Sequence, residues 1–104
     1  MAERADLGWS TYRDAAATDP DVANDWHQLQ MVRRRNFHLV IGAIPPARLR
    51  PGLVSATAAD TAWVIASPES FELLVRRAGY NADEFEQWIA HTLIGALLPE
   101  RAAT

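Results

Sequence analysis

The chain has 104 residues, no cysteine, a formal net charge of -3 and a pI near 5.5. The length suits a single domain that buries roughly two-thirds of its unfolded surface. The lack of cysteine excludes disulfides, thiol catalysis and cysteine-ligated zinc, and the acidic balance disfavours direct nucleic-acid binding, which needs a basic surface. The N-terminus is too polar for a signal peptide and no apolar run approaches the ~20 residues of a membrane span, so we expect a cytoplasmic protein that does not contact membranes.

The pattern predicts five helices and no strand, and we expect them to form one all-α domain over the whole chain, an antiparallel five-helix bundle. The first helix covers residues 2–17. The second begins cleanly, because Asp19 is a suitable N-cap and Pro20 suits the first helical position. The Pro45–Pro46 pair must end this long helix. After a turn, Ser55 opens a third helix that is rich in alanine.

The last two helices also carry clear boundary signals. Ser67, followed by a proline, caps the start of the fourth helix, and Gly79 ends it in the left-handed conformation that glycine favours. In the fifth helix Asn81 and Glu84 have the spacing of a capping box, with asparagine in place of serine or threonine. This helix is predicted to reach about Leu98.

The long second helix has an arginine inside its apolar stripe. At 100° per residue the stripe comprises Val22, Trp26, Leu29, Val40 and Ile44, with Arg33 in its middle. One interpretation is structural: Arg33 pairs with a carboxylate such as Glu72 or Glu86 on a neighbouring helix. The other is that Arg33 supplies a polar group to an apolar ligand pocket, where a guanidinium would suit a carboxylate or phenolate. The candidate pocket residues are Trp26, Leu29, Gln30, Arg33, Asn36 and Phe37.

Other chemistry is weakly signalled, and no enzyme activity, metal site or cofactor is expected. His27 and His38 lie about 16 Å apart along one helix, too far to share a metal, and both are expected in solvent. His91 has no zinc-motif spacing around it. Arg34 and Arg35 are expected on the solvent side, because helical geometry spreads the arginine run over different faces.

The third and fifth helices carry more apolar surface than one core contact needs, which predicts a homodimer with a four-helix interface about a two-fold axis. Small residues on both helices would allow close approach. The candidate interface residues are Ala58, Ala62, Ile65, Ala66, Phe85, Trp88, Ile89, Thr92, Gly95 and Ala96. The alternative is that these stripes only complete the core of the monomer.

Four stretches resemble the C-terminal ligand-sensing domain of TetR-type (tetracycline-repressor-like) transcriptional regulators. They are "DPDVANDWHQLQMVRRRN", "ARLRPGLVSATAADTAWVIASPESFELLV", "RRAGYNADEFEQWI" and "AHTLIGALL", and the resemblance covers about residues 15–98. The resemblance implies a helical domain that dimerises and binds a small hydrophobic ligand within its bundle. Members of this family begin with a helix-turn-helix domain, and nothing here matches one, so we expect no DNA-binding domain in this chain. The alternative function is a stand-alone interaction protein that pairs with itself or with intact regulators and binds no ligand.

Overall fold

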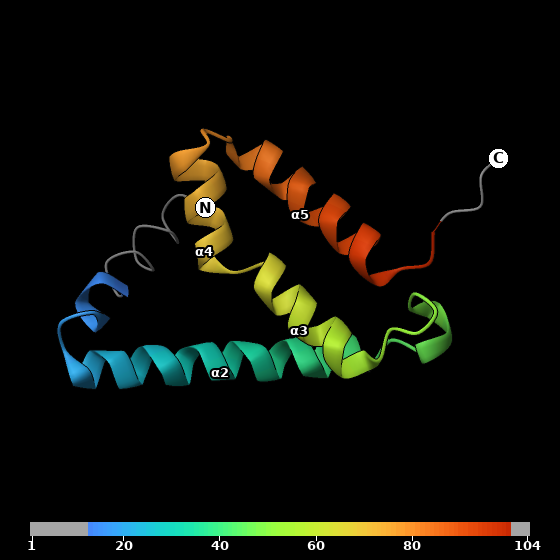
Figure 1. Ribbon diagram of the computed structural model, residues 1–104, viewed down its shortest axis with the longest axis horizontal. Coiled ribbons are helices and arrows are strands. Elements are labelled where there is room, and N and C mark those ends of the chain that lie inside the picture. Colours follow the sequence, from blue (N-terminus) through green and yellow to red (C-terminus); the bar gives the residue numbers. More distant parts are fainter. Residues whose placement is uncertain (1–12, 101–104) are drawn as a thin grey trace.

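The computed structural model describes residues 13–100, and this part of the chain is helical without any β-strand. Its α-helices are α2 (Pro20–Gly42), α3 (Ser55–Ile65), α4 (Pro68–Phe71) and α5 (Ala82–Leu97). A 3-10 turn, η1 (Pro46–Arg48), precedes α3, and a π-helical segment, η2 (Glu72–Arg77), continues α4 (Figure 1). The all-α fold class is confirmed for these residues. Most of the first predicted helix, over residues 2–17, lies outside the described residues, and residues 13–16 are helical.

Local capping interactions start three of the helices as the sequence predicts. Asp19 accepts hydrogen bonds from backbone N–H groups of the first turn of α2 at 2.9 and 3.4 Å. Ser67 Oγ accepts from the Ser70 N–H at 3.2 Å at the start of α4. Asn81 and Glu84 form both hydrogen bonds of the capping box, at 2.8 and 3.0 Å. In contrast, Ser55 is the first residue of α3 rather than its cap, and no side chain caps that helix.

The fourth predicted helix ends where expected but is not regular. The Ala78 N–H donates to the Leu73 carbonyl at 2.9 Å, five residues back, and the Tyr80 N–H donates to the Leu74 carbonyl at 2.9 Å. Gly79 then adopts a φ of 84°, the left-handed conformation predicted for it. A π turn holds more residues than an α turn, so the 3.6-residue spacing used for the sequence prediction does not apply to this segment.

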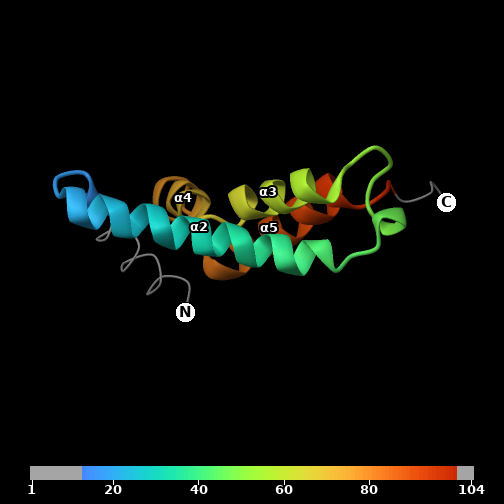
Figure 2. The ribbon, with the colours of Figure 1, turned by 90° about the horizontal axis from the view of Figure 1, so that it is seen from below.

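Helix α3 is the centre of the arrangement, because it packs against both α2 and α5. It runs back along α2 from the C-terminal end of that helix, and α5 lies on its other side (Figures 1 and 2). The molecule measures 50 × 29 × 18 Å with a radius of gyration of 15.7 Å, against about 13 Å for a compact domain of this length. It is therefore flat and elongated, and a five-helix antiparallel bundle is not confirmed.

Small side chains form the core. Ala58, Ala59 and Ala62 of α3 are at most 1% exposed, and they pack with Ile41, Leu49 and Leu97. Alanine has a single side-chain carbon, so helices can approach closely where it lines the contact. A second, smaller contact joins α4 to α5, where the rings of Phe71 and Phe85 meet edge to face at 5.2 Å.

The buried face of α2 is rotated from its predicted position. Val40 is 68% exposed and Leu29 is 36% exposed, whereas Ile41 is 8% exposed and lies in the core. Phe37 also packs against the core. The predicted stripe was wrong at Val40 because the sequence alone does not fix which side of α2 meets the alanines of α3.

Candidate functional site

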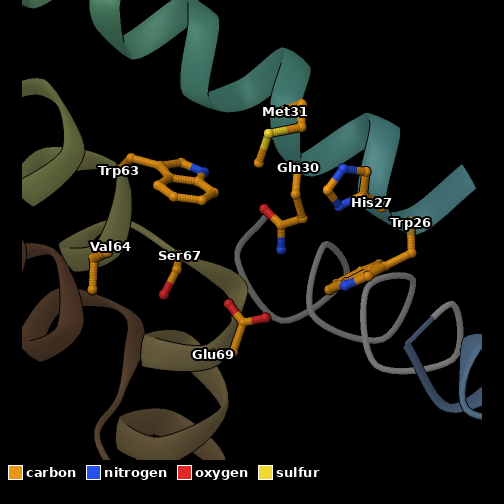
Figure 3. A pocket seen from close by; sticks show the side chains of 8 residues that line it. All are labelled: Trp26, His27, Gln30, Met31, Trp63, Val64, Ser67 and Glu69. Atoms are coloured by element: carbon orange, nitrogen blue, oxygen red, sulfur yellow. The ribbon is translucent and has the colours of Figure 1, made fainter. Parts of the chain in front are cut away.

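A cavity of about 400 Å³ lies between the N-terminal half of α2 and the corner where α3 leads into α4. This volume falls in the usual range of small-molecule sites, about 300–1,000 Å³. The described residues that line it are Trp26, His27, Gln30, Met31, Trp63, Val64, Ser67 and Glu69 (Figure 3). Two indole rings, a thioether and a valine give it mainly apolar walls, and a few polar groups converge on them.

Arg33 lies beside this cavity and fixes the orientation of one of its lining residues. Its Nη1 donates to Gln30 Oε1 at 2.9 Å, and its Nη2 donates to the Ala66 carbonyl, at the end of α3, at 2.8 Å. Because arginine has only donors, the Gln30 amide must turn its oxygen toward Arg33 and its nitrogen away. Figure 3 shows this nitrogen pointing into the cavity. Arg33 therefore joins α2 to α3 and sets a hydrogen-bond donor in the cavity wall.

The guanidinium of Arg33 lies in a partly dry environment. Desolvation lowers the pKa of Arg33 from its usual value, and the negative charge of Glu69 opposes this shift. Its carbon atom Cζ lies 5.8 Å from the centre of the Phe37 ring, a cation–π distance. Glu72, one of the carboxylates considered for pairing with Arg33, instead forms a salt bridge with Arg13.

Trp63 lines the cavity with its indole ring, and the nitrogen of that ring is buried within the fold. Its Nε1 is buried and has no hydrogen-bond partner in the described part of the chain. A buried N–H without an acceptor costs about 1–3 kcal/mol. Native structures rarely leave such a donor unsatisfied, and the exceptions call for a functional explanation.

The start of α4 supplies the acidic residue of the cavity lining. Ser67 caps this helix, and Ser70 Oγ donates to the Val64 carbonyl at 3.2 Å, which fixes the corner between α3 and α4. Glu69 follows in the first turn of α4, and its carboxylate points toward Gln30 and Ser67 in Figure 3. A carboxylate near a helix N-terminus is favoured by the helix dipole.

A cluster of charged groups joins the middle of α2 to α3. Arg34 Nε and Nη2 donate to the two oxygens of Asp60 at 2.7 and 2.9 Å, and His38 Nε2 lies 2.8 Å from Asp60 Oδ1. The hydrogen bond from Arg34, followed by that from His38, lowers the pKa of Asp60 from 3.8 to about 2. Arg34 and His38, predicted on the solvent side, keep 42 and 31% of their side chains exposed, and their contacts with Asp60 of α3 were not predicted.

The structure brings together two of the six predicted pocket residues. Trp26 and Gln30 line the cavity, whereas Leu29, Arg33, Asn36 and Phe37 do not. Leu29 and Asn36 are exposed, and Phe37 packs against the core. Trp63 and Glu69 were not predicted to line a pocket. Both lie in segments whose sequence signals, an apolar stripe and a serine–proline cap, indicate structural roles.

The predicted dimer residues divide into two groups. Ala58, Ala62 and Phe85 are 0, 1 and 7% exposed, so the alternative kept open for these stripes, completion of the monomer core, holds for these three. Their side chains are used inside the chain because α2 or α4 covers them, and they leave almost no surface for a partner. Gly95 is exposed and the others are partly buried; these are Ile65, Ala66, Trp88, Ile89, Thr92 and Ala96.

The described residues lack the features of a metal site and of a membrane span. No group of three or more His, Cys, Asp or Glu side chains in this part of the chain could hold a metal ion. Within the same residues, no helix has both the length and the apolar character needed to cross a membrane.

Comparisons with known proteins leave the family open. None of the protein-family models, curated proteins or solved structures compared with the chain matches it. The cavity and the exposed apolar surface are therefore the features of the molecule that bear on its function.

Proposed function

We propose that this chain is the ligand-sensing and dimerisation module of a transcriptional regulator similar to the TetR type. The observation that carries the proposal is the cavity beside Trp26 and Trp63, whose mainly apolar described lining also includes Gln30, Ser67 and Glu69. An apolar site of this size with a few convergent polar groups is typical of small-molecule binding.

The position of the cavity offers a route from ligand to interface. One wall belongs to α2, and the other belongs to the corner that leads into α4 and, through η2, into α5. A ligand that contacts both walls would favour one position of α4 relative to α2. Such a ligand can shift the protein between two states only as far as its affinities for them differ.

The exposed side of α5 supports the dimerisation half of the proposal. Ile94 and Leu98 are 50 and 37% exposed, and a Cβ atom added at Gly95 would meet nothing within 4 Å. A second copy related by a two-fold axis could cover this surface, because such an interface uses the same patch on both subunits. We therefore centre the interface on α5 and leave the buried alanines of α3 out of it.

The dimer is tested by light scattering on the purified protein. Unmodified protein should give twice the chain mass of 11.5 kDa, and Gly95→Arg should give folded monomer. Gln28→Arg, which adds the same charge at an exposed position on α2, is the matched control and should remain dimeric. A folded monomer at ~100 µM, where a micromolar interface is saturated, would rule out the dimer.

The ligand is tested separately by thermal shift with a broad panel of small aromatic compounds. At least one compound should raise the unfolding temperature, since a ligand that binds only the folded state stabilises it. A dimer that no compound stabilises would favour the alternative function, a stand-alone interaction protein that pairs with itself or with intact regulators. The described residues include ten exposed large apolar side chains, and this surface is the observation in favour of that alternative.

A further inference from the structure

We infer that the cavity selects an aromatic ligand that carries a protonated amine at one end and a hydrogen-bond acceptor, such as a carbonyl oxygen, near its ring. This inference rests on the proposed function, because it names the chemical class that the sensing site would take. It also reverses the preference for a carboxylate that an inward-facing arginine suggests.

Charge is the first argument. Among the described residues that line the cavity, Glu69 is the single acid and there is no lysine or arginine. Arg33 lies outside this lining, and two of its donors are already bonded to Gln30 and to the Ala66 carbonyl. A carboxylate ligand would meet Glu69 without a guanidinium fork to receive it, whereas an ammonium would meet a carboxylate.

The aromatic walls are the second argument. Trp26 and Trp63 contribute indole rings from opposite sides of the cavity (Figure 3). Tryptophan is the best aromatic partner for a cation, and its face also stacks on flat rings. A flat ligand with an ammonium group would therefore use both the rings and Glu69.

A donor in the cavity wall is the third argument. Arg33 donates to the Gln30 oxygen, so the Gln30 nitrogen is the atom presented to the ligand. This nitrogen needs an acceptor, and neither the ammonium nor the ring of the ligand supplies a strong one. A carbonyl oxygen next to the ring would accept its hydrogen bond.

The experiment uses three naphthamides that share the ring and the amide and differ in the short group at the far end. They are N-(2-aminoethyl)-2-naphthamide, N-(2-naphthoyl)glycine and N-propyl-2-naphthamide, which are cationic, anionic and neutral at pH 7. Calorimetric titration of the full chain should show the cation binding at least about tenfold more tightly than the anion, in line with a desolvated cation–π contact supported by a carboxylate. The neutral amide should fall between them.

Two variants assign this preference to its source. Glu69→Gln should reduce the ratio between cation and anion to about threefold or less, while Glu86→Gln, at an exposed acid on α5 outside the cavity lining, should leave it unchanged. Gln30→Met removes the donor in the cavity wall and leaves both indole rings in place. It should weaken the naphthamide cation by about threefold or more, as expected for the loss of one hydrogen bond, and should leave binding of 4-(2-naphthyl)butylamine, which lacks the carbonyl, unchanged.

The outcomes separate the inference from the proposed function. Tighter binding of the anion, or a preference for the cation that survives Glu69→Gln, would overturn the inference and leave a ligand-sensing site in place. Equal binding of all three compounds would also overturn it. If none of the three binds and the broad panel also fails, the ligand-sensing function falls with it.

Discussion

The two ends of the contact between α2 and α3 are built from opposite kinds of side chain. Near the C-terminus of α2, Ile41 packs on the alanines of α3, and Ala58 and Ala62 are at most 1% exposed. Nearer the N-terminus of α2, Trp26 and Trp63 line a cavity of about 400 Å³. Small residues let two helices approach until no space remains, whereas large rings keep the backbones apart and leave room between them. One helix pair therefore supplies both a closed core and an open site.

Polar contacts also join α2 to α3. Asp60 forms hydrogen bonds with Arg34 and His38, and the guanidinium of Arg33 donates to the Ala66 carbonyl. Along α2, Arg33, Arg34 and His38 lie between Trp26 and Ile41, and their bonds fix the position of α3 along this helix. We infer that the cavity keeps its shape because these polar contacts and the alanine core fix α3 against α2.

The largest loss of stability is expected from a charge placed in the alanine core between α2 and α3. Ala62→Glu should destabilise the fold by more than about 4 kcal/mol, because the new carboxylate would be buried without a partner. Thermal unfolding followed by circular dichroism measures this, with Ala56→Glu at an exposed position of the same helix as the control. If the two variants unfold at the same temperature, Ala62 faces solvent or a partner and the closed core is wrong.

An intermediate effect on stability is expected from removing the hydrogen bonds of Arg33, next to the cavity. Arg33→Met should cost about 1–3 kcal/mol, because the Ala66 carbonyl loses a charged donor in a partly buried place. It should also weaken the naphthamide cation, since the Gln30 amide is then able to flip. Arg35→Met, at an exposed position on the same helix, is the control for denaturant unfolding. Equal stability of the two variants would contradict the structural role given to Arg33.

The smallest effect is expected from removing the ion pair between Arg34 and Asp60. Their side chains are 42 and 41% exposed, and water screens their charges. The folded pKa of Asp60 is about 2, below its usual 3.8, so its stabilising contribution is present above the unfolded value and is lost as pH falls through the folded one. Asp60→Asn should therefore unfold at a lower temperature than the unmodified chain at neutral pH, and the difference should close near pH 2.

Asp25→Asn, at an exposed acid of α2, is the control for this pH series. Its unfolding temperature should follow that of the unmodified chain from neutral pH down to acid. A constant difference between Asp60→Asn and the unmodified chain across the whole series would mean that Asp60 does not titrate as the structure requires.

Helix boundaries could be predicted because their signals are local. The Asp19 cap, the Ser67 cap and the Asn81–Glu84 capping box each depend on residues within four positions of one another, and all three form. Gly79 likewise takes its left-handed conformation at the expected place. The π turn within residues 72–77 was missed, because its wider hydrogen bonds leave no distinct spacing in the sequence.

The candidate site could be predicted only in part. Trp26 and Gln30 were found because both lie on the apolar side of α2, and each lines the cavity. Glu69 and Trp63 join them from residues more than thirty positions away, and no spacing rule relates the two segments. The role expected for Arg33 also changed, since its partner is a backbone carbonyl, and backbone carbonyls carry no mark in a sequence.

By itself the sequence determined that the described residues are mainly helical, where α2, α4 and α5 are capped, and that one arginine lies near their apolar side. These features follow from capping groups, proline, glycine and the helical repeat, which act within a few residues. The tertiary structure decided which face of α2 is buried, that Ala58 and Ala62 belong to the core, and that Glu69 rather than Arg33 lines the cavity. Such choices depend on how closely helices far apart in the chain can pack, and that is set by the side chains of both helices together.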